Sequence, residues 1–142
     1  MNPAPLFLGT SGLLLFAIGL VLGFAIPLLR NSRMGLSAHL TAVQTGPALV
    51  AIGLFWRYCS VPPAWDWPLA VVLAGSSYIL VCGIGLAAAT GASEALPIAG
   101  KGHRGTRMQE RLVSVLVVGS SLAMLGAIIP VCWFALGAVI VP

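Results

Sequence analysis

Four long stretches of this chain contain no charged side chain, and they constrain the fold more than any other feature. They are residues 1–29, 34–56, 67–93 and 112–142. Each exceeds the roughly 20 residues that a helix needs to cross a bilayer. In hydrocarbon only helices and closed barrels satisfy their own backbone polar groups, and these unbroken apolar runs lack the alternation of barrel strands. The sequence predicts an all-α, integral-membrane four-helix bundle.

The composition excludes an ordinary water-soluble globule. Of the 142 residues, 59% are hydrophobic and 7% are charged, whereas soluble domains carry about 25% charged residues. We predict a single domain over residues 1–142, with membrane helices at 5–29, 36–58, 67–89 and 111–136. The connection at 30–35 is so short that the first two helices must be antiparallel neighbours. The connection at 90–110 is rich in glycine, which predicts turn and coil until a helix resumes near Thr106.

The positive charges gather in two of the three connections. Arg57 is the one basic residue elsewhere; the other six are Arg30, Arg33, Lys101, Arg104, Arg107 and Arg111. Seven basic residues spread over three loops form no nucleic-acid stripe, so the expected partner is the lipid bilayer. Because basic residues stay on the cytoplasmic side of membrane proteins, we expect loops 30–35 and 90–110 to be cytoplasmic. Both termini would then face outward from the inner membrane.

His39 is the leading functional candidate, because an ionisable residue inside a membrane span is a functional hypothesis by default. It lies near the start of the predicted second helix, and its helix face continues through small or apolar residues: Ala42, Gly46, Leu49 and Gly53. One interpretation is a flat trough that admits a planar macrocycle, with the imidazole as ligand of its iron. The other is an imidazole bonded to a backbone carbonyl, with the small residues packing against another helix.

Other polar groups could complete a site around His39. His103 belongs to the third loop, which the topology places on the same membrane face as His39, and the nearby arginines make that face cationic. Positive-inside topology accounts for most of this charge, although arginines there could also clamp carboxylates. Glu110 lies three residues after Arg107, a spacing that suits an ion pair on a helix.

Few hydroxyl and amide groups lie inside the predicted spans. Gln44 and Thr45 follow His39 by one to two helical turns, so one of them could face the same cavity, and Tyr78 lies on the third span. Such groups most often bond to backbone or to a neighbouring helix. The chain has no Cys-x-x-Cys-His sequence for covalent haem attachment, and no phosphate loop or paired carboxylates.

Two stretches resemble the signature of the hydroxylaminobenzene mutase family. The first is the run from Asn31 to Leu40, NSRMGLSAHL, followed by Gly46 and by AIGLFW at 51–56. The second is PIAGKGH at 97–103, continuing to Gln109 and Glu110. More distantly, residues 38–39 and GPAL at 46–49 are similar to styrene oxide isomerase, another small four-span enzyme.

The resemblance implies an isomerase that converts an arylhydroxylamine to an ortho-aminophenol by a Bamberger-type intramolecular hydroxyl shift. It further implies haem b as a Lewis acid, His39 as the metal ligand, and a homo-oligomer, a trimer by analogy with styrene oxide isomerase. Gly46 would lie beside the cofactor, with Arg33, His103 and Arg107 as cap or propionate partners. The polar groups nearest a small aromatic substrate would be Thr45, Gln44 and Tyr78.

Some positions depart from the mutase pattern. Thr41 stands where the family has an acidic residue, Thr45 where it has asparagine, and Ile79 and Leu80 where it has an Asn-Trp pair. These changes leave open an epoxide isomerase of the styrene oxide type on the same scaffold. A non-catalytic small membrane protein or transporter is the third alternative. It is less favoured, because no Asp or Glu for proton coupling lies within any predicted span.

Overall fold

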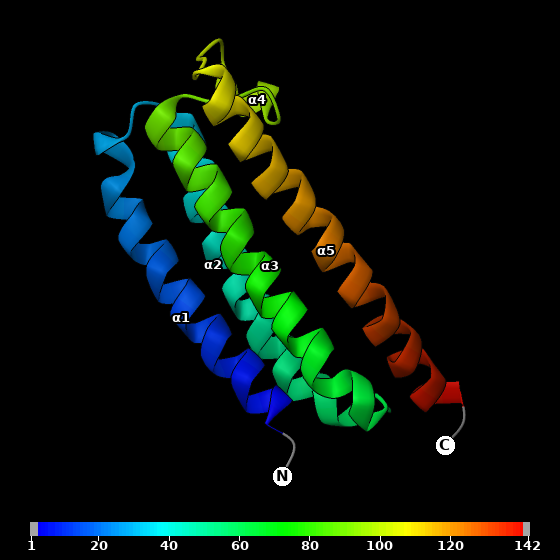
Figure 1. Ribbon diagram of the computed structural model, residues 1–142. Coiled ribbons are helices and arrows are strands. Elements are labelled where there is room, and N and C mark those ends of the chain that lie inside the picture. The colour runs from blue at the N-terminus through cyan, green and yellow to red at the C-terminus, as the bar shows by residue number, and fades with distance from the viewer. Residues whose placement is uncertain (1–2, 141–142) are drawn as a thin grey trace.

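The computed structural model describes residues 3–140, and four long helices dominate this part of the chain. They run lengthwise beside one another (Figure 1), and each is long and apolar enough to cross a membrane. The predicted all-α membrane bundle is confirmed. The long helices are α1 (Ala4–Ala25), α2 (Ser32–Phe55), α3 (Pro63–Thr90) and α5 (Arg107–Ile140); the short ones are η1 (Ile26–Leu28), η2 (Trp56–Tyr58) and α4 (Pro97–Gly100).

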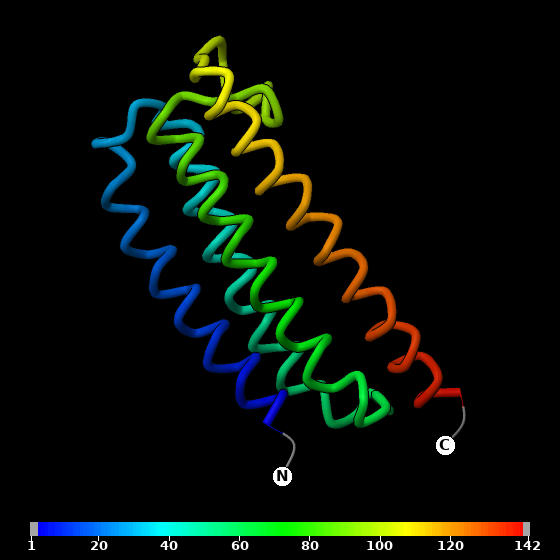
Figure 2. The backbone as a smooth tube through the Cα atoms, in the orientation of Figure 1, coloured from blue at the N-terminus to red at the C-terminus, as the bar shows by residue number. Residues whose placement is uncertain are grey.

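The helices pack in chain order rather than as a symmetric square. α1 lies along α2, α2 also contacts α3, and α5 packs mainly along α3. The backbone trace in Figure 2 shows α1 and α5 at the two outer edges, with α2 and α3 between them. The short first connection therefore does make the first two helices antiparallel neighbours.

Three helices begin one turn before the predicted positions. α2 begins at Ser32 because the Asn31 side chain accepts a hydrogen bond from the Met34 backbone N–H at 3.1 Å, which caps the helix. α3 begins at Pro63, since proline suits the first helical position, where no N–H is needed. α5 begins at Arg107, close to the predicted restart near Thr106.

Glycine residues bring the backbones of α1 and α2 into contact. A Cβ atom added to Gly46 would lie 2.7 Å from the carbonyl oxygen of Gly12, and one added to Gly53 would lie 2.7 Å from that of Pro5. Neither position could hold a larger side chain without moving α1. Close approach through small residues is the usual way in which membrane helices associate.

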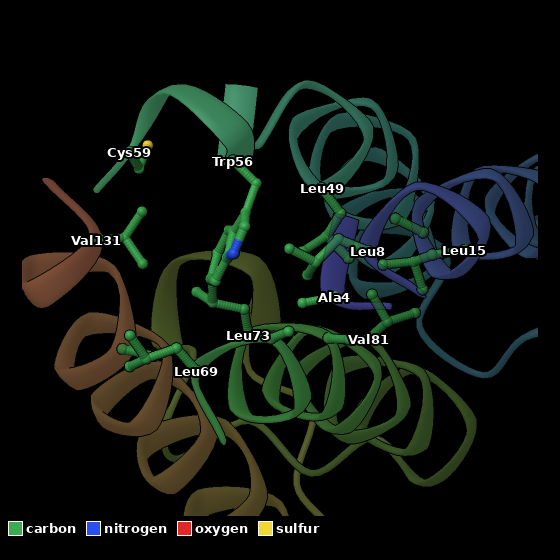
Figure 3. Close-up of a cluster of buried hydrophobic side chains, with 14 residues drawn as sticks. Ala4, Leu8, Leu15, Leu49, Trp56, Cys59, Leu69, Leu73, Val81 and Val131 are labelled. Carbon is green, nitrogen blue, oxygen red and sulfur yellow. The ribbon is translucent and has the colours of Figure 1, made fainter. Parts of the chain in front are cut away.

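Trp56 fills the centre of the core at the end that carries the two chain termini. Its side chain is 2% exposed and lies beside Leu73 and Leu49 (Figure 3). The indole Nε1 donates a hydrogen bond of 2.8 Å to the Asp66 carboxylate in the first turn of α3. A buried indole N–H needs such a partner, and this bond fixes the turn between α2 and α3.

The first and third connections meet at the opposite end of the bundle, away from the two termini (Figure 1). Arg30 Nη1 donates a hydrogen bond of 2.8 Å to the Thr90 carbonyl oxygen, and the Asn31 backbone N–H donates one of 2.9 Å to that of Ala88. The predicted common polar layer is therefore confirmed. That this layer faces the cytoplasm stays a prediction.

Candidate functional site

His39 lies between α2 and α1, and one hydrogen bond fixes its ring. Nδ1 is 2.7 Å from the backbone carbonyl oxygen of Gly19. Because a carbonyl oxygen can only accept, Nδ1 carries the proton, and the lone pair of the neutral ring is on Nε2. The ring edge rests on Gly23, where an added Cβ would lie 3.0 Å from Nδ1 and 3.1 Å from Cε1.

The strip of small residues below His39 is covered by α1. Ala42, Gly46, Leu49 and Gly53 are all buried, and Gly46 lies against the backbone of Gly12 and Phe16. The prediction of an open trough along this face is therefore wrong within the chain, because α1 already fills the space. The structure instead agrees with the second interpretation, in which the imidazole bonds to a backbone carbonyl and the small residues pack against another helix. Gly46 serves helix packing.

Nε2 of His39 has no protein partner within residues 3–140. The side chain is half-buried, and no fully buried side-chain nitrogen or oxygen in that part of the chain lacks a hydrogen bond. Nε2 therefore reaches the surface of the bundle. An unpaired polar atom facing hydrocarbon is unfavourable, so this nitrogen is suited to a ligand from outside the single chain.

Gln44 and Thr45 do not share the His39 side of α2. At 100° per residue, Gln44 lies about 140° around the helix from His39, and Thr45 about 120°. Gln44 is exposed and Thr45 is half-buried. The prediction that one of them faces a cavity with His39 is not met within the chain, because the three side chains point in different directions.

Tyr78 links α3 to α1. Its hydroxyl donates a hydrogen bond of 2.8 Å to the carbonyl oxygen of Ser11. Ser11 precedes Gly19 by eight positions on α1, which is about 12 Å along a helix. The Tyr78 hydroxyl therefore bonds to α1 about two helical turns deeper in the bundle than His39 does, and it already has a partner.

The polar end of the molecule contains two separate depressions, and His39 borders neither. One is an apolar groove of about 440 Å³ between α2 and residues 95–99, with Arg33 at its edge. The other is a polar cavity of about 690 Å³ between loop 93–105 and α5, bordered by His103 and Arg107. The predicted cap residues thus share a layer but lie in two different places, since α4 stands between them.

His103 is held by its own loop. Its ring Nδ1 lies 3.1 Å from the Gly100 carbonyl oxygen, which also accepts the His103 backbone N–H at 3.0 Å. The His103 carbonyl oxygen accepts a bond of 2.5 Å from the Ser93 hydroxyl. These bonds close the loop on itself and keep this histidine away from His39.

Glu110 organises the third connection. Its carboxylate accepts three backbone N–H bonds, from Gly105 at 2.8 Å on one oxygen and from Ser93 and Glu94 at 2.9 and 2.8 Å on the other. The predicted ion pair with Arg107 is not formed, because these backbone donors occupy the carboxylate. Nothing in the sequence indicated this arrangement, since the donors are main-chain groups brought together by the fold.

Asn31 is a second residue whose role the sequence analysis missed. While its oxygen caps α2, its amide nitrogen donates to the carbonyl oxygens of Ala99 and Gly100 at 3.3 and 3.2 Å. One side chain therefore starts α2 and fastens α4 to it. The signal available in the sequence was an asparagine directly before a helical pattern.

Within residues 3–140, no group of three or more His, Cys, Asp or Glu side chains is placed to hold a metal ion. His39 is therefore not part of a cluster that could hold a free metal ion by itself. It could anchor a metal that arrives within a prosthetic group, as one axial imidazole does for haem iron.

Comparison with known proteins assigns the chain to a family. Residues 7–136 match the family model described as styrene oxide isomerase. The chain is 40% identical over 122 residues to hydroxylaminobenzene mutase HabA of Ectopseudomonas oleovorans, covering 85% of this chain and 90% of that protein. It is 36% identical over 117 residues to HabB of the same organism, covering 80% and 70%.

No solved structure matches the chain. The resemblance to hydroxylaminobenzene mutases and to styrene oxide isomerase that the motifs around His39 and His103 indicated is confirmed. The family model extends over all four long helices. This chain belongs to the styrene oxide isomerase family.

Proposed function

We propose that this protein is a membrane isomerase that rearranges an arylhydroxylamine to an ortho-aminophenol. The observation that carries the proposal is the 40% identity to a hydroxylaminobenzene mutase over most of both chains. The reaction is redox-neutral: the N–O bond breaks, a C–O bond forms at the ortho carbon, and the proton from that carbon passes to nitrogen. No electron donor or acceptor is consumed.

The donor set of His39 fits a haem. A metal-binding histidine commonly donates its other ring N–H to a backbone carbonyl, which fixes the tautomer and the orientation of the ring. His39 has this arrangement, with Gly19 as the acceptor. When bound, ferric haem supplies a Lewis acid that polarises the N–O bond of the substrate.

A prosthetic group on Nε2 would lie outside the core of the single chain, because α1 fills the strip below His39. A homo-oligomer, a trimer by resemblance to the family, would enclose it between subunits. Gln44 is exposed on α2 in the membrane-spanning region. An amide in that position needs a polar partner, and a substrate or a neighbouring subunit could supply one; the half-buried Thr45 hydroxyl could contribute similarly.

The chain itself positions the imidazole of His39 and keeps water away from the substrate. Gly19 fixes the imidazole, and the apolar helices around it exclude water, which protects an electron-poor nitrogen intermediate from side reactions. The Arg33 guanidinium forms no hydrogen bond or ion pair within residues 3–140, so it is free to hold an acidic group of cofactor or substrate. His103 and Arg107 border a different cavity, and we do not assign them to the cofactor.

The polar layer formed by loops 30–35 and 90–110 faces the cytoplasm in this proposal, with both termini outside. The six basic residues of that layer support this orientation in the inner membrane.

Product analysis tests the proposed reaction. Membranes containing the full chain are incubated with hydroxylaminobenzene, and the products are separated by chromatography. We expect 2-aminophenol, and we expect its formation to be lost in His39→Ala. Membranes lacking the protein are the control for spontaneous rearrangement.

An epoxide isomerase is the second candidate, because the matching family model is that of styrene oxide isomerase. The same membranes are therefore also incubated with styrene oxide. Conversion of the epoxide to phenylacetaldehyde without any 2-aminophenol from the hydroxylamine would establish this alternative. Conversion of neither substrate by folded, haem-supplied protein would refute both activities.

A further inference from the structure

The polar cavity beside α5 is lined by cationic groups that the proposed isomerase activity does not use. It has a volume of about 690 Å³, and three arginines border it: Arg104, Arg107 and Arg111. The guanidinium groups of Arg107 and Arg111 form no hydrogen bond or ion pair within residues 3–140. Because these two residues are one turn apart on α5, they project from the same helix face.

The acidic residues of the cavity balance only part of this charge, because two carboxylates, Glu94 and Glu110, face three arginines. Both oxygens of Glu110 are occupied by the backbone N–H groups of Ser93, Glu94 and Gly105. The Glu94 side chain is exposed, and neither carboxylate forms an ion pair with Arg107 or Arg111. The cavity therefore presents an excess of positive charge on a loop that Glu110 holds in a fixed conformation.

The position of the cavity along α5 places it in the headgroup layer of the bilayer. Arg111 directly precedes the charge-free part of the helix, which begins at Leu112 and crosses the membrane. Two large apolar residues next in sequence to the cavity residues Pro97 and Arg107 are exposed, Ile98 by 90% and Met108 by 78%, and Ile98 borders the neighbouring apolar groove. Such side chains are favourable where they meet lipid chains, so the surrounding surface is that of a membrane interface.

We propose that this cavity binds the phosphate of an anionic phospholipid. Guanidinium groups bind phosphate through paired, charge-assisted hydrogen bonds, and basic pockets at the cytoplasmic ends of membrane helices suit acidic headgroups. A free phosphate ion offers the same chemistry, but the position of the cavity next to the apolar part of α5 favours the lipid. Bound lipid fastens the third connection to the membrane next to α5.

Native mass spectrometry of the detergent-purified full chain tests this proposal. The protein is equilibrated with equal amounts of phosphatidylglycerol and phosphatidylcholine, and the lipid retained by each chain is identified. We expect wild type to prefer phosphatidylglycerol. One basic residue near an anionic surface contributes about a five-fold gain in affinity. The preference should therefore fall about 25-fold in Arg107→Gln/Arg111→Gln.

Arg57→Gln is the matched control, because Arg57 lies at the other end of the bundle and donates to the Tyr58 hydroxyl. It should retain phosphatidylglycerol as wild type does. Glu94→Gln removes an exposed carboxylate from the cavity and should strengthen retention. This variant also tests the proposal if the double variant does not fold.

Equal retention of the two lipids by wild type would overturn the proposal, as would unchanged selectivity in the double variant or in Glu94→Gln. Inorganic phosphate added at the lipid concentration tests the other source of the same chemistry. If it displaces phosphatidylglycerol, the cavity is a site for soluble phosphate and the lipid assignment is wrong. If it does not, the lipid assignment stands.

Discussion

The chemistry available at His39 depends on one contact between helices. The Gly19 carbonyl oxygen fixes the proton on Nδ1 and leaves the Nε2 lone pair at the bundle surface. The position of the ring also requires a glycine at residue 23, because a Cβ atom there would press on the Nδ1 edge of the ring. Two glycines on α1 therefore set both the tautomer and the direction of a histidine on α2.

Gly23→Ala should displace the imidazole without removing it. The added Cβ would lie 3.0 Å from Nδ1, so the ring must shift and its bond to Gly19 must weaken. Disturbing the partner of a metal-binding histidine lowers activity by roughly 10- to 100-fold. We expect a loss of that size in 2-aminophenol formation, measured on protein that still elutes as wild type does.

The matched control is Gly119→Ala, since an added Cβ there meets no atom within 4 Å. Its activity should equal that of wild type. Equal losses in the two glycine variants, or no loss in Gly23→Ala, would show that the contact between Gly23 and His39 is unimportant.

The Asn31 side chain has two separable tasks. Asn31→Ser keeps an oxygen that can cap α2 but loses the amide that binds Ala99 and Gly100. We expect trypsin to cleave after Lys101 faster than in wild type while the melting temperature changes little. Asn31→Ala should show the same cleavage and also lose about 1 kcal/mol of stability with the cap.

Ser32→Ala serves as the control, because the Ser32 side chain is exposed and forms no hydrogen bond. If Asn31→Ser is cleaved no faster than this control, the bonds from Asn31 to α4 do not hold the loop in place.

At the residue scale, the sequence was sufficient to identify His39 but not its partner. An ionisable group within an apolar span can be recognised from the sequence alone. Its bond to Gly19 joins residues on two helices, and the Gly19 and Gly23 spacing indicates a helix contact without saying which residue is contacted. The roles of Glu110 and Asn31 were missed for the same reason, because their partners are backbone groups of distant segments.

At the scale of the helices, the contact between α1 and α2 is the most extensive within residues 3–140, and glycines lie in it. Gly46→Ala would place a Cβ 2.7 Å from the Gly12 carbonyl oxygen and force the two helices apart. Overpacking of this kind costs roughly 1–3 kcal/mol. We expect a lower melting temperature in detergent, together with reduced activity, because α1 also carries Gly19.

Gly75→Ala on α3 is the control for that substitution, since an added Cβ there has no neighbour within 4 Å. Alanine also favours a helix more than glycine does, so this variant should be at least as stable as wild type. A Gly46→Ala protein as stable as the control would contradict the close packing of α1 on α2.

Hydropathy predicted the number and the order of the helices, because each span must satisfy its own backbone in lipid. The ends of the helices were less certain. α2 and α3 begin earlier than the apolar pattern does, at a polar cap and at a proline. The strip from Ala42 to Gly53 was recognised as small, but a single helix does not reveal whether its small face is open or covered, and here α1 covers it.

At the scale of the whole molecule, six of the seven basic residues lie at one end of the bundle. The first and third connections interlock there through Arg30 and Asn31, while Trp56 and Asp66 fix the opposite end. The distribution of basic residues predicted this shared layer, since topology alone brings alternate loops to one face. It did not predict the division of the layer by α4, which depends on the bonds from Asn31.

The absorption spectrum of the detergent-purified full chain, produced with haem available, tests the assignment of His39 most directly. Wild type should show the Soret band of a bound haem, and His39→Ala should lack it while retaining its helical content and its elution volume. His103→Ala, which removes the other histidine, should keep the band. A wild-type protein without the band, or an undiminished band in His39→Ala, would contradict the assignment of His39 as the iron ligand.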